Sequence, residues 1–253
     1  MSEISRPLTK NDHLDPLKEY YHDMFSVSDN DERIQNFKKK GIALLVIDMQ
    51  YLDAAKGFGV FKDITTSGIP VEQQNYYFDS LKEYVIPNVQ RLLKVFRSNN
   101  MEVIHTRIQS LTRDGRDRSH GHKRLNLLAP PGSKEAEFLT EVAPLDNEII
   151  INKTASGVFS STNLNYVLNN LEIHELVVAG VYSNECVETT IRDACDLGYL
   201  VSMVEDACTT VTPELHQATI TNLSYRYAEV VTTNAIERRF LKKALSVKSA
   251  NGH

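Results

Sequence analysis

Cys186 is the residue of this chain whose position most favours a chemical role. It follows an apolar run, 176–179, and a short turn, and an amphipathic pattern begins directly after it. This order predicts a buried strand, a tight turn and a helix, with Cys186 at or near the helix N-terminus. Free backbone N–H groups and the positive end of the helix dipole favour a thiolate there, which makes Cys186 a candidate nucleophile. A small buried hydrophobe is the alternative that the sulfur alone leaves open.

Two further polar residues stand where predicted strands end. Asp48 and Lys153 each follow a short apolar run with β-branched residues. Since ligands bind beyond the carboxyl ends of parallel strands, we expect both side chains to lie close to Cys186. Alone, each is weak evidence, because an aspartate there is often a cap and a lysine is usually solvated. Together they supply a base for the thiol proton, a nucleophile and a stabilising ammonium group.

The turn before the candidate nucleophile offers a further device. Backbone N–H groups in this turn, those of Tyr182 and Cys186, are placed to form an oxyanion hole. Such a hole stabilises the negative oxygen that develops when a nucleophile attacks a carbonyl carbon.

The elements that must position these residues alternate between strands and helices. Strands are predicted at 42–47, 102–106, 149–151, 176–179, 200–204 and 229–232. Helices are predicted at 81–98, after Thr162, after Cys186 and after Pro213. This alternation predicts an α/β fold, a doubly wound, mostly parallel six-stranded sheet with helices on both faces, as in Rossmann-like proteins.

Composition sets the broad class of the protein. The chain has 253 residues, 42% of them hydrophobic, and a formal net charge of −5, so nothing in the bulk charge suggests a nucleic-acid or anionic-membrane partner. No apolar run approaches the ~20 residues that span a bilayer. Three cysteines without a Cys-x-x-Cys pair indicate a reducing compartment, and we expect a cytoplasmic protein. We divide the chain into a polar N-terminal arm (1–40), one α/β domain (41–235) and a basic C-terminal tail (236–253).

Three segments resemble the signatures of a known family. Residues 45–50, 153–159 and 180–187 are similar to the motifs of the isochorismatase-like cysteine hydrolases, and the resemblance extends over about residues 41–235. It implies an Asp-Lys-Cys triad and a cis peptide bond between Val181 and Tyr182. It also implies hydrolysis of C–N bonds in small amides or ureido compounds through a thioester acyl-enzyme. Members of the family are mostly homo-oligomers, so a dimer or tetramer is expected.

Departures from related families narrow the chemistry. Nicotinamidases carry an Asp-x-His metal element after the second strand, and residues 105–110 read His-Thr-Arg-Ile-Gln-Ser instead. We therefore predict no metal and no cofactor, and we interpret His120 and His122 as surface residues. A nicotinamidase-like hydrolase of cyclic amides and a non-catalytic binding protein with this fold remain the alternatives.

Four residues are candidates for contact with a small-molecule substrate. Gln50 is suited to bond an amide or ureido group, or else to pack beneath its loop. Arg107 is suited to bind a carboxylate, although arginines and aspartates of the 107–131 loop also form a pattern typical of a self-paired surface. Phe159 and Tyr182 are suited to wall the pocket, or to belong to the core.

Overall fold

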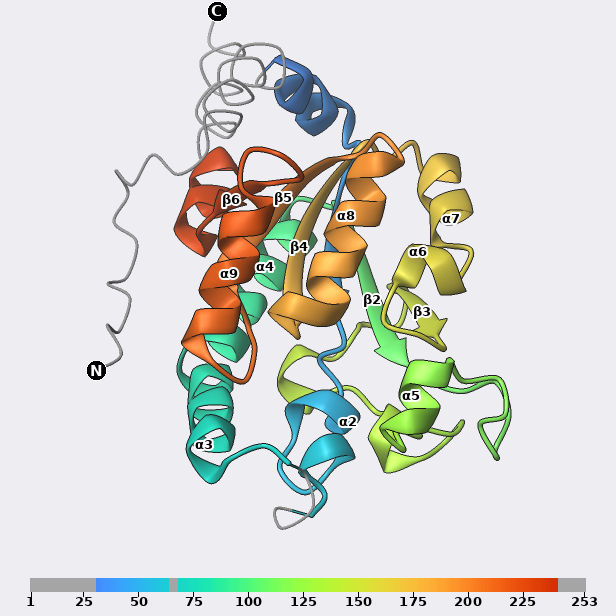
Figure 1. Cartoon of the computed structure of the whole chain (residues 1–253). Helices are drawn as coiled ribbons and strands as arrows, with labels where there is room; N and C mark the ends of the chain where they lie inside the picture. Colours follow the sequence, from blue (N-terminus) through green and yellow to red (C-terminus); the bar gives the residue numbers. More distant parts are fainter. Residues whose placement is uncertain (1–30, 64–67, 241–253) are drawn as a thin grey trace, which may run out of the picture.

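The computed structural model describes residues 31–63 and 68–240, and these form an α/β fold around one parallel sheet (Figure 1). The sheet has six strands in the order β3-β2-β1-β4-β5-β6. They are β1 (Ile42–Ile47), β2 (Glu102–Ile108), β3 (Ile149–Lys153), β4 (Glu175–Val181), β5 (Leu200–Thr209) and β6 (Glu229–Val231). The predicted fold class is confirmed, and β1 and β4, where the strand order reverses, lie at the centre.

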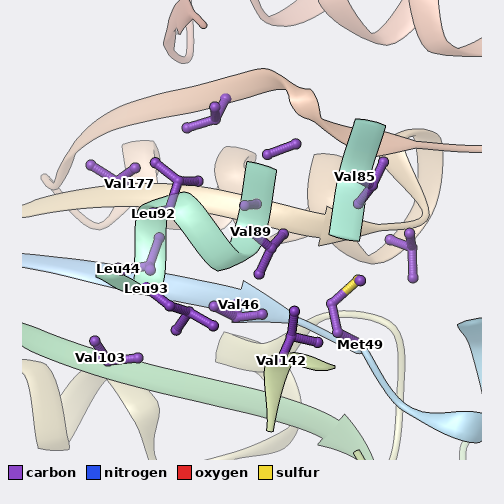
Figure 2. Close-up of a cluster of buried hydrophobic side chains, with 14 of the residues drawn as sticks. Leu44, Val46, Met49, Val85, Val89, Leu92, Leu93, Val103, Val142 and Val177 are labelled. Carbon is purple, nitrogen blue, oxygen red and sulfur yellow. The ribbon is translucent and has the colours of Figure 1, made fainter. Parts of the chain in front are cut away.

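The central strands are apolar on both sides because helices cover both faces of the sheet. Every residue of β1 and β4 is buried. Figure 2 shows one face, where Leu44, Val46 and Val177 pack against Val89 and the leucines of a long helix. Alternate side chains of the same strands enter a second core on the opposite face.

Helices fill the connections between the strands. They are α2 (Tyr51–Ala54), α3 (Val71–Ser80), α4 (Ile86–Ser98), α5 (His120–Arg124), α6 (Val158–Ser161), α7 (Leu164–Asn170), α8 (Glu188–Asp196) and α9 (Pro213–Leu223). Short 3₁₀ turns lie at Gly59–Phe61, Lys134–Ala136 and Thr140–Val142. Side chains of α3 and α4 pack on one face of the sheet, whereas those of α7, α8 and α9 pack on the other.

The structure corrects the helix predicted at 81–98. The helical stretch begins ten residues earlier, at Val71, and a π-helical turn, Leu81–Val85, joins α3 to α4. In that turn the Ile86 N–H donates to the Leu81 carbonyl, five residues back. The π-helical turn ends two residues before Pro87, which has no N–H to donate. The proline therefore interrupts the hydrogen-bonding pattern without ending the helix. Two regions expected to be loops also contain helices, namely α2 and α5.

Both ends of the described chain pack at the amino-terminal edge of the sheet. Residues 31–39 and 233–240 are helical, and the rings of Phe37 and Phe240 meet edge to face with their centroids 4.7 Å apart. In Figure 1 the arrowhead of β2 points toward α5, whereas helical residues 31–39 lie at the opposite end of the sheet. Arg33 pairs with Glu175 of β4, and the ring of Phe240 packs on that of Phe96, so contacts cross both predicted boundaries, at residues 40 and 235. The rest of the predicted arm and tail lies outside the described residues. Within the described ranges, none of the helices has the length and apolar character of a membrane-spanning segment.

Candidate active site

Asp48 leaves the end of β1 in an unusual backbone conformation. Its φ is +51°, in the left-handed region that residues other than glycine seldom adopt. Its carboxylate oxygen Oδ1 accepts a hydrogen bond of 2.9 Å from the Thr106 hydroxyl, and its N–H donates to the Thr106 carbonyl over 3.2 Å. The neighbouring strand β2 therefore fixes both the backbone and the side chain of Asp48.

Lys153 joins the other two candidates. It is the last residue of β3, and its side chain is fully buried. The Nζ atom lies 2.7 Å from Asp48 Oδ2 and donates over 3.3 Å to Cys186 Sγ and over 3.0 Å to the Ala155 carbonyl. Lys153 thus contacts both of the other residues that the sequence placed at this edge. We call the three residues the Asp48–Lys153–Cys186 cluster.

Cys186 lies in a π-helical turn, Ser183–Val187, that leads into α8. The turn is entered through a cis peptide bond between Val181 and Tyr182, as the family resemblance implied. The Tyr182 carbonyl accepts hydrogen bonds from the N–H groups of Glu185 and Val187, which holds the turn closed. Cys186 is only 3% exposed, so a substrate must enter the fold to reach its sulfur.

Gly180 brings this turn against β1. Its φ of +122° favours glycine, and a Cβ atom at this position would lie 2.1 Å from the Ile47 carbonyl oxygen. Because Ile47 directly precedes Asp48, the missing side chain lets the strand that carries the carboxylate approach the strand that carries the sulfur.

Burial determines the charge state of the cluster. Burial raises the pKa of the Cys186 thiol well above its usual value; the Lys153 ammonium opposes this shift and the carboxyl groups of Asp48 and Asp53 add to it. Burial by itself lowers the pKa of Lys153, but Asp48 and Cys186 raise it on balance. The sequence predicted a thiolate at the helix N-terminus, whereas the structure favours a neutral thiol beside an Asp48–Lys153 ion pair, because desolvation outweighs the nearby positive charge.

Gln50 is fully buried and its amide is occupied by backbone groups. Its Nε2 donates to the carbonyls of Ile108 and Glu135 over 3.0 and 2.8 Å, and its Oε1 accepts from the Ile108 N–H. Gln50 therefore fastens its loop to β2, the second of its two expected roles, and a substrate contact stays a prediction.

The other three substrate-binding candidates lie in different surroundings. The Arg107 guanidinium donates to Asn152 Oδ1 and to the Ala136 carbonyl, over 2.7 and 2.9 Å, and these contacts are not with the cluster. The Phe159 ring stacks on the ring of Tyr199, a residue between α8 and β5, and the two ring centroids are 5.9 Å apart. Tyr182 lies beside the cluster, at the start of the segment 182–187, which carries Cys186 and which we call the nucleophile turn.

Two buried polar residues near the cluster were missed by sequence reasoning. Asp53, on α2, is 4% exposed, and its carboxyl is close enough to Asp48 and Lys153 for both to change its pKa. His122, on α5, is equally buried, contrary to the surface position predicted for it. Its helix is held beside the end of β3 because the Ser119 N–H donates to the Thr154 carbonyl. Burial lowers the pKa of His122 to about 4.

Among the described residues, the surroundings of the cluster offer no set of metal ligands. Within the part of the chain that the structure describes, no group of three or more His, Cys, Asp or Glu side chains could hold a metal ion. A cleft of about 700 Å³ opens beside α2, but its walls come from Leu52, Glu135 and the segments 59–63 and 124–130 rather than from the cluster.

Comparison with known proteins decides the family. The family model of the isochorismatase domain matches residues 42–235, which include the whole cluster. The chain belongs to the isochorismatase family. The crystal structure of a cysteine hydrolase from Pseudomonas syringae has the same fold, with a TM-score of 0.64 and 24% identity over 80% of this chain and 93% of that one.

Curated relatives agree with this assignment. An uncharacterized isochorismatase family protein of Bacillus subtilis, YddQ, is 32% identical over 68% of this chain and 98% of its own length. The ureidoacrylate amidohydrolase RutB of Acinetobacter baylyi is 27% identical over 82% of this chain and 87% of its own. Nicotinamidase 3 of Arabidopsis thaliana is 28% identical over 68% and 86%. The chain is thus an isochorismatase-family enzyme, and the relatives similar to it include proteins named as an amidohydrolase and a nicotinamidase.

Proposed function

We propose that this protein is a metal-independent cysteine amidohydrolase that cleaves the C–N bond of a small linear amide or N-carbamoyl (ureido) compound. The observation that carries the proposal is the buried ammonium group of Lys153, which contacts both the buried carboxylate of Asp48 and the sulfur of Cys186. Similarity to an enzyme named as a ureidoacrylate amidohydrolase supports the ureido class.

The first half of the reaction forms the acyl-enzyme. Asp48 takes the thiol proton as Cys186 attacks the carbonyl carbon, so the high pKa of the buried thiol is overcome only when a substrate is present. The oxyanion is held by backbone N–H groups of Tyr182 and Cys186. When the tetrahedral intermediate collapses, the C–N bond breaks and Asp48 returns the proton to the leaving nitrogen, which departs as ammonia or an amine.

The second half releases the product. Water attacks the thioester while Asp48 accepts its proton. The C–S bond then breaks, and Asp48 returns the proton to the departing sulfur. Lys153 stays protonated throughout, because its pKa is raised by the neighbouring charges, and it offsets the negative charge that moves between carboxylate and sulfur. The net charge of the cluster and the reacting carbonyl group together is therefore constant from one step to the next.

The setting of the enzyme is also part of the proposal. All three cysteines are free, which supports a reducing, cytoplasmic compartment. Assembly into a homo-oligomer, as a dimer or tetramer, agrees with the family resemblance and with the common preference of enzymes for symmetric assemblies. A small molecule is the expected partner, rather than a nucleic acid or a membrane.

Ammonia release from a panel of small amides and ureido compounds tests this function. The wild-type protein should turn over at least one of them, and Cys186→Ala should abolish that turnover. Cys195→Ala, which removes a half-exposed sulfur outside the cluster, is the matched control and should keep the wild-type rate. Mass spectrometry of the quenched enzyme should detect the acyl group on Cys186, and near-native turnover by Cys186→Ala would exclude the mechanism.

A chelator separates this function from that of a nicotinamidase-like enzyme with a metal. Dialysis against EDTA should leave turnover unchanged if the reaction needs no metal. Loss of activity on nicotinamide that zinc restores would favour the second candidate, for which the similarity to the plant nicotinamidase is the supporting observation.

A further inference from the structure

Asp53 is the buried acidic residue whose presence near the cluster the mechanism leaves unexplained. The side chain is 4% exposed, and its Oδ2 atom has no hydrogen-bond partner among the described residues. A buried polar atom without a partner destabilises the fold, so proteins seldom retain one without a reason. The Asp53 carboxyl interacts electrostatically with Asp48, Lys153 and Cys186, so it belongs to the same site.

The backbone of Asp53 is held in place by two aromatic residues. The hydroxyls of Tyr77 and Tyr182 both donate to the Asp53 carbonyl, over 2.8 and 2.9 Å. Their rings stack with centroids 5.1 Å apart, one coming from α3 and the other from the turn that carries the nucleophile. Asp53 is thus fixed relative to Cys186, which is the condition for a residue that positions a substrate.

The charges around Asp53 favour its neutral form. Burial raises the pKa of Asp53 well above its usual value, Asp48 and Glu185 raise it further, and Lys153 opposes the shift. The titratable groups that face it are Asp48 at the end of β1, Lys153 at the end of β3, Tyr77 on α3, and Tyr182, Glu185 and Cys186 in the nucleophile turn. Lys153 is the one cation among these neighbours, and it is already paired with Asp48.

We propose that the neutral Asp53 carboxyl group hydrogen-bonds an uncharged carboxamide or ureido group of the substrate and makes the site reject a carboxylate there. A protonated carboxyl offers one donor and one acceptor, the set that an amide or ureido group matches. A substrate carboxylate would instead meet Asp48, Glu185 and an acid that can ionise. This inference rests on the proposed function and narrows its substrates to those that are uncharged near the scissile bond.

Alkylation of Cys186 by iodoacetamide and by iodoacetate provides the test, because the two reagents differ only in carboxamide and carboxylate. The quantity measured is the ratio of their second-order rate constants at Cys186, divided by the same ratio for glutathione. Any change in the reactivity of the thiol itself cancels in this ratio. Peptide mapping by mass spectrometry assigns the label to Cys186 rather than to Cys195 or Cys208.

We expect the wild type to prefer iodoacetamide by at least about tenfold, because its carboxamide can both donate to and accept from the neutral acid. Iodoacetate can only accept, and its charge is repelled by the nearby carboxylate of Asp48. Asp53→Ala should lose at least about fivefold of the preference, and Asp53→Asn, which keeps a donor and an acceptor, should recover most of it. Asp79→Ala, which removes an exposed aspartate of α3, is the control and should match the wild type. An unchanged preference in Asp53→Ala overturns the proposal.

A pH series supplies a second test, which stands even if Asp53→Ala does not fold. Raising the pH ionises Asp53 in the wild type and adds a negative charge, so the preference for iodoacetamide should rise. In Asp53→Asn it should stay flat over the same range, and identical pH dependence in the two proteins contradicts the proposal. If neither reagent labels Cys186 in any variant, Cys186 is not the nucleophile and both proposals fail. If both reagents label Cys186 readily and Asp53 has no effect on their ratio, only the proposal for Asp53 fails and the proposed function stands.

Discussion

Two buried carboxylates lie at opposite ends of the same pair of central strands. Glu175 pairs in register with Ile42 at the start of β1, and Asp48 follows the end of β1. Both are almost completely buried, and each contacts a cation. Their partners differ, because Glu175 is held by the guanidinium groups of Arg33 and Arg239, whereas Asp48 faces the single ammonium of Lys153.

The difference separates a structural ion cluster from a reactive one. At the Glu175 end, Arg33 also donates to Ser202 Oγ and to the Val201 carbonyl, and Arg239 also pairs with Glu229. Planar guanidinium groups with several fixed bonds stabilise one arrangement. At the Asp48 end, one ammonium group is shared between a carboxylate and a sulfur, so charge can move between them. The same strands therefore hold the two ends of the described part of the chain at one edge and support chemistry at the other.

Removing the Asp48–Lys153 pair as a unit should give the largest separation of activity from stability. The double variant Asp48→Asn/Lys153→Met should lower kcat by at least about 10³-fold, because the base and its counter-charge are both lost. Its melting temperature should stay within a few degrees of wild type, since replacing a buried ion pair by neutral groups is often neutral or stabilising. Ammonia release and thermal unfolding measure the two effects; unaltered kcat contradicts the role of the pair.

Glu175→Gln should show the reverse behaviour. Removing the carboxylate leaves two arginines without their buried partner, which should cost about 3 kcal/mol of unfolding free energy. For a domain of this size the melting temperature should fall by roughly 6–12 °C, while kcat of the folded enzyme stays within about twofold of wild type. Glu229→Gln, at the exposed partner of the same cluster, is the control and should cost at most about 1 kcal/mol. A large loss of kcat in Glu175→Gln would mean that the two ends are coupled.

His105, in the middle of β2, should make the free energy of unfolding fall at acidic pH. Burial lowers its pKa to about 4, although Glu148 at 3.2 Å opposes the shift. The unfolded chain binds a proton near pH 6.5 and the folded chain does not, so stability is lost as the pH falls from about 6.5 toward 4. Between pH 7.5 and 5 this loss should be about 2 kcal/mol for His105 alone.

Urea unfolding of wild type and His105→Gln at the two pH values measures that share. The variant should lose about 2 kcal/mol less on acidification, and the fall that remains should include the contribution of His122, whose pKa is also about 4. Equal pH dependence in the two proteins would show that His105 is protonated in the folded state.

Thr106→Val should have the smallest effect of these changes on kcat and on stability. It removes the hydroxyl that donates to Asp48 Oδ1 and keeps the shape of the side chain. We expect kcat to fall by about tenfold, because the carboxylate loses a fixed orientation, with a stability cost of about 1 kcal/mol. A stability loss without a change in kcat would assign Thr106 to the scaffold alone.

The sheet and the cluster were predictable for a definite physical reason. Strands buried on both faces are continuous apolar runs, and parallel connections bring their carboxyl ends to one edge, so Asp48, Lys153 and Cys186 had to meet there. Asp53 was not predictable in this way, because α2 has four residues and a single helical turn shows no periodicity. The burial of His122 depends on the packing of α5 against the Thr154 segment, a contact between distant parts of the chain.

The thiol shows a different limit of sequence reasoning. Its place beside a helix N-terminus suggested a thiolate, but the cost of desolvation depends on the whole fold and on carboxyl groups from other elements. Arg107 is similar, since its neighbours Asn152 and Ala136 come from β3 and from the segment before it. Charge states and partners of polar groups are properties of the packed molecule rather than of local segments.

The absence of a side chain at Gly180 has a consequence for engineering. Because main-chain packing of β4 on β1 sets the separation between sulfur and carboxylate, substrate preference can be redesigned at surrounding positions without retuning the reactive pair. Libraries that vary the pocket should leave residue 180 untouched, since even one methyl group there would push the two halves of the reaction centre apart.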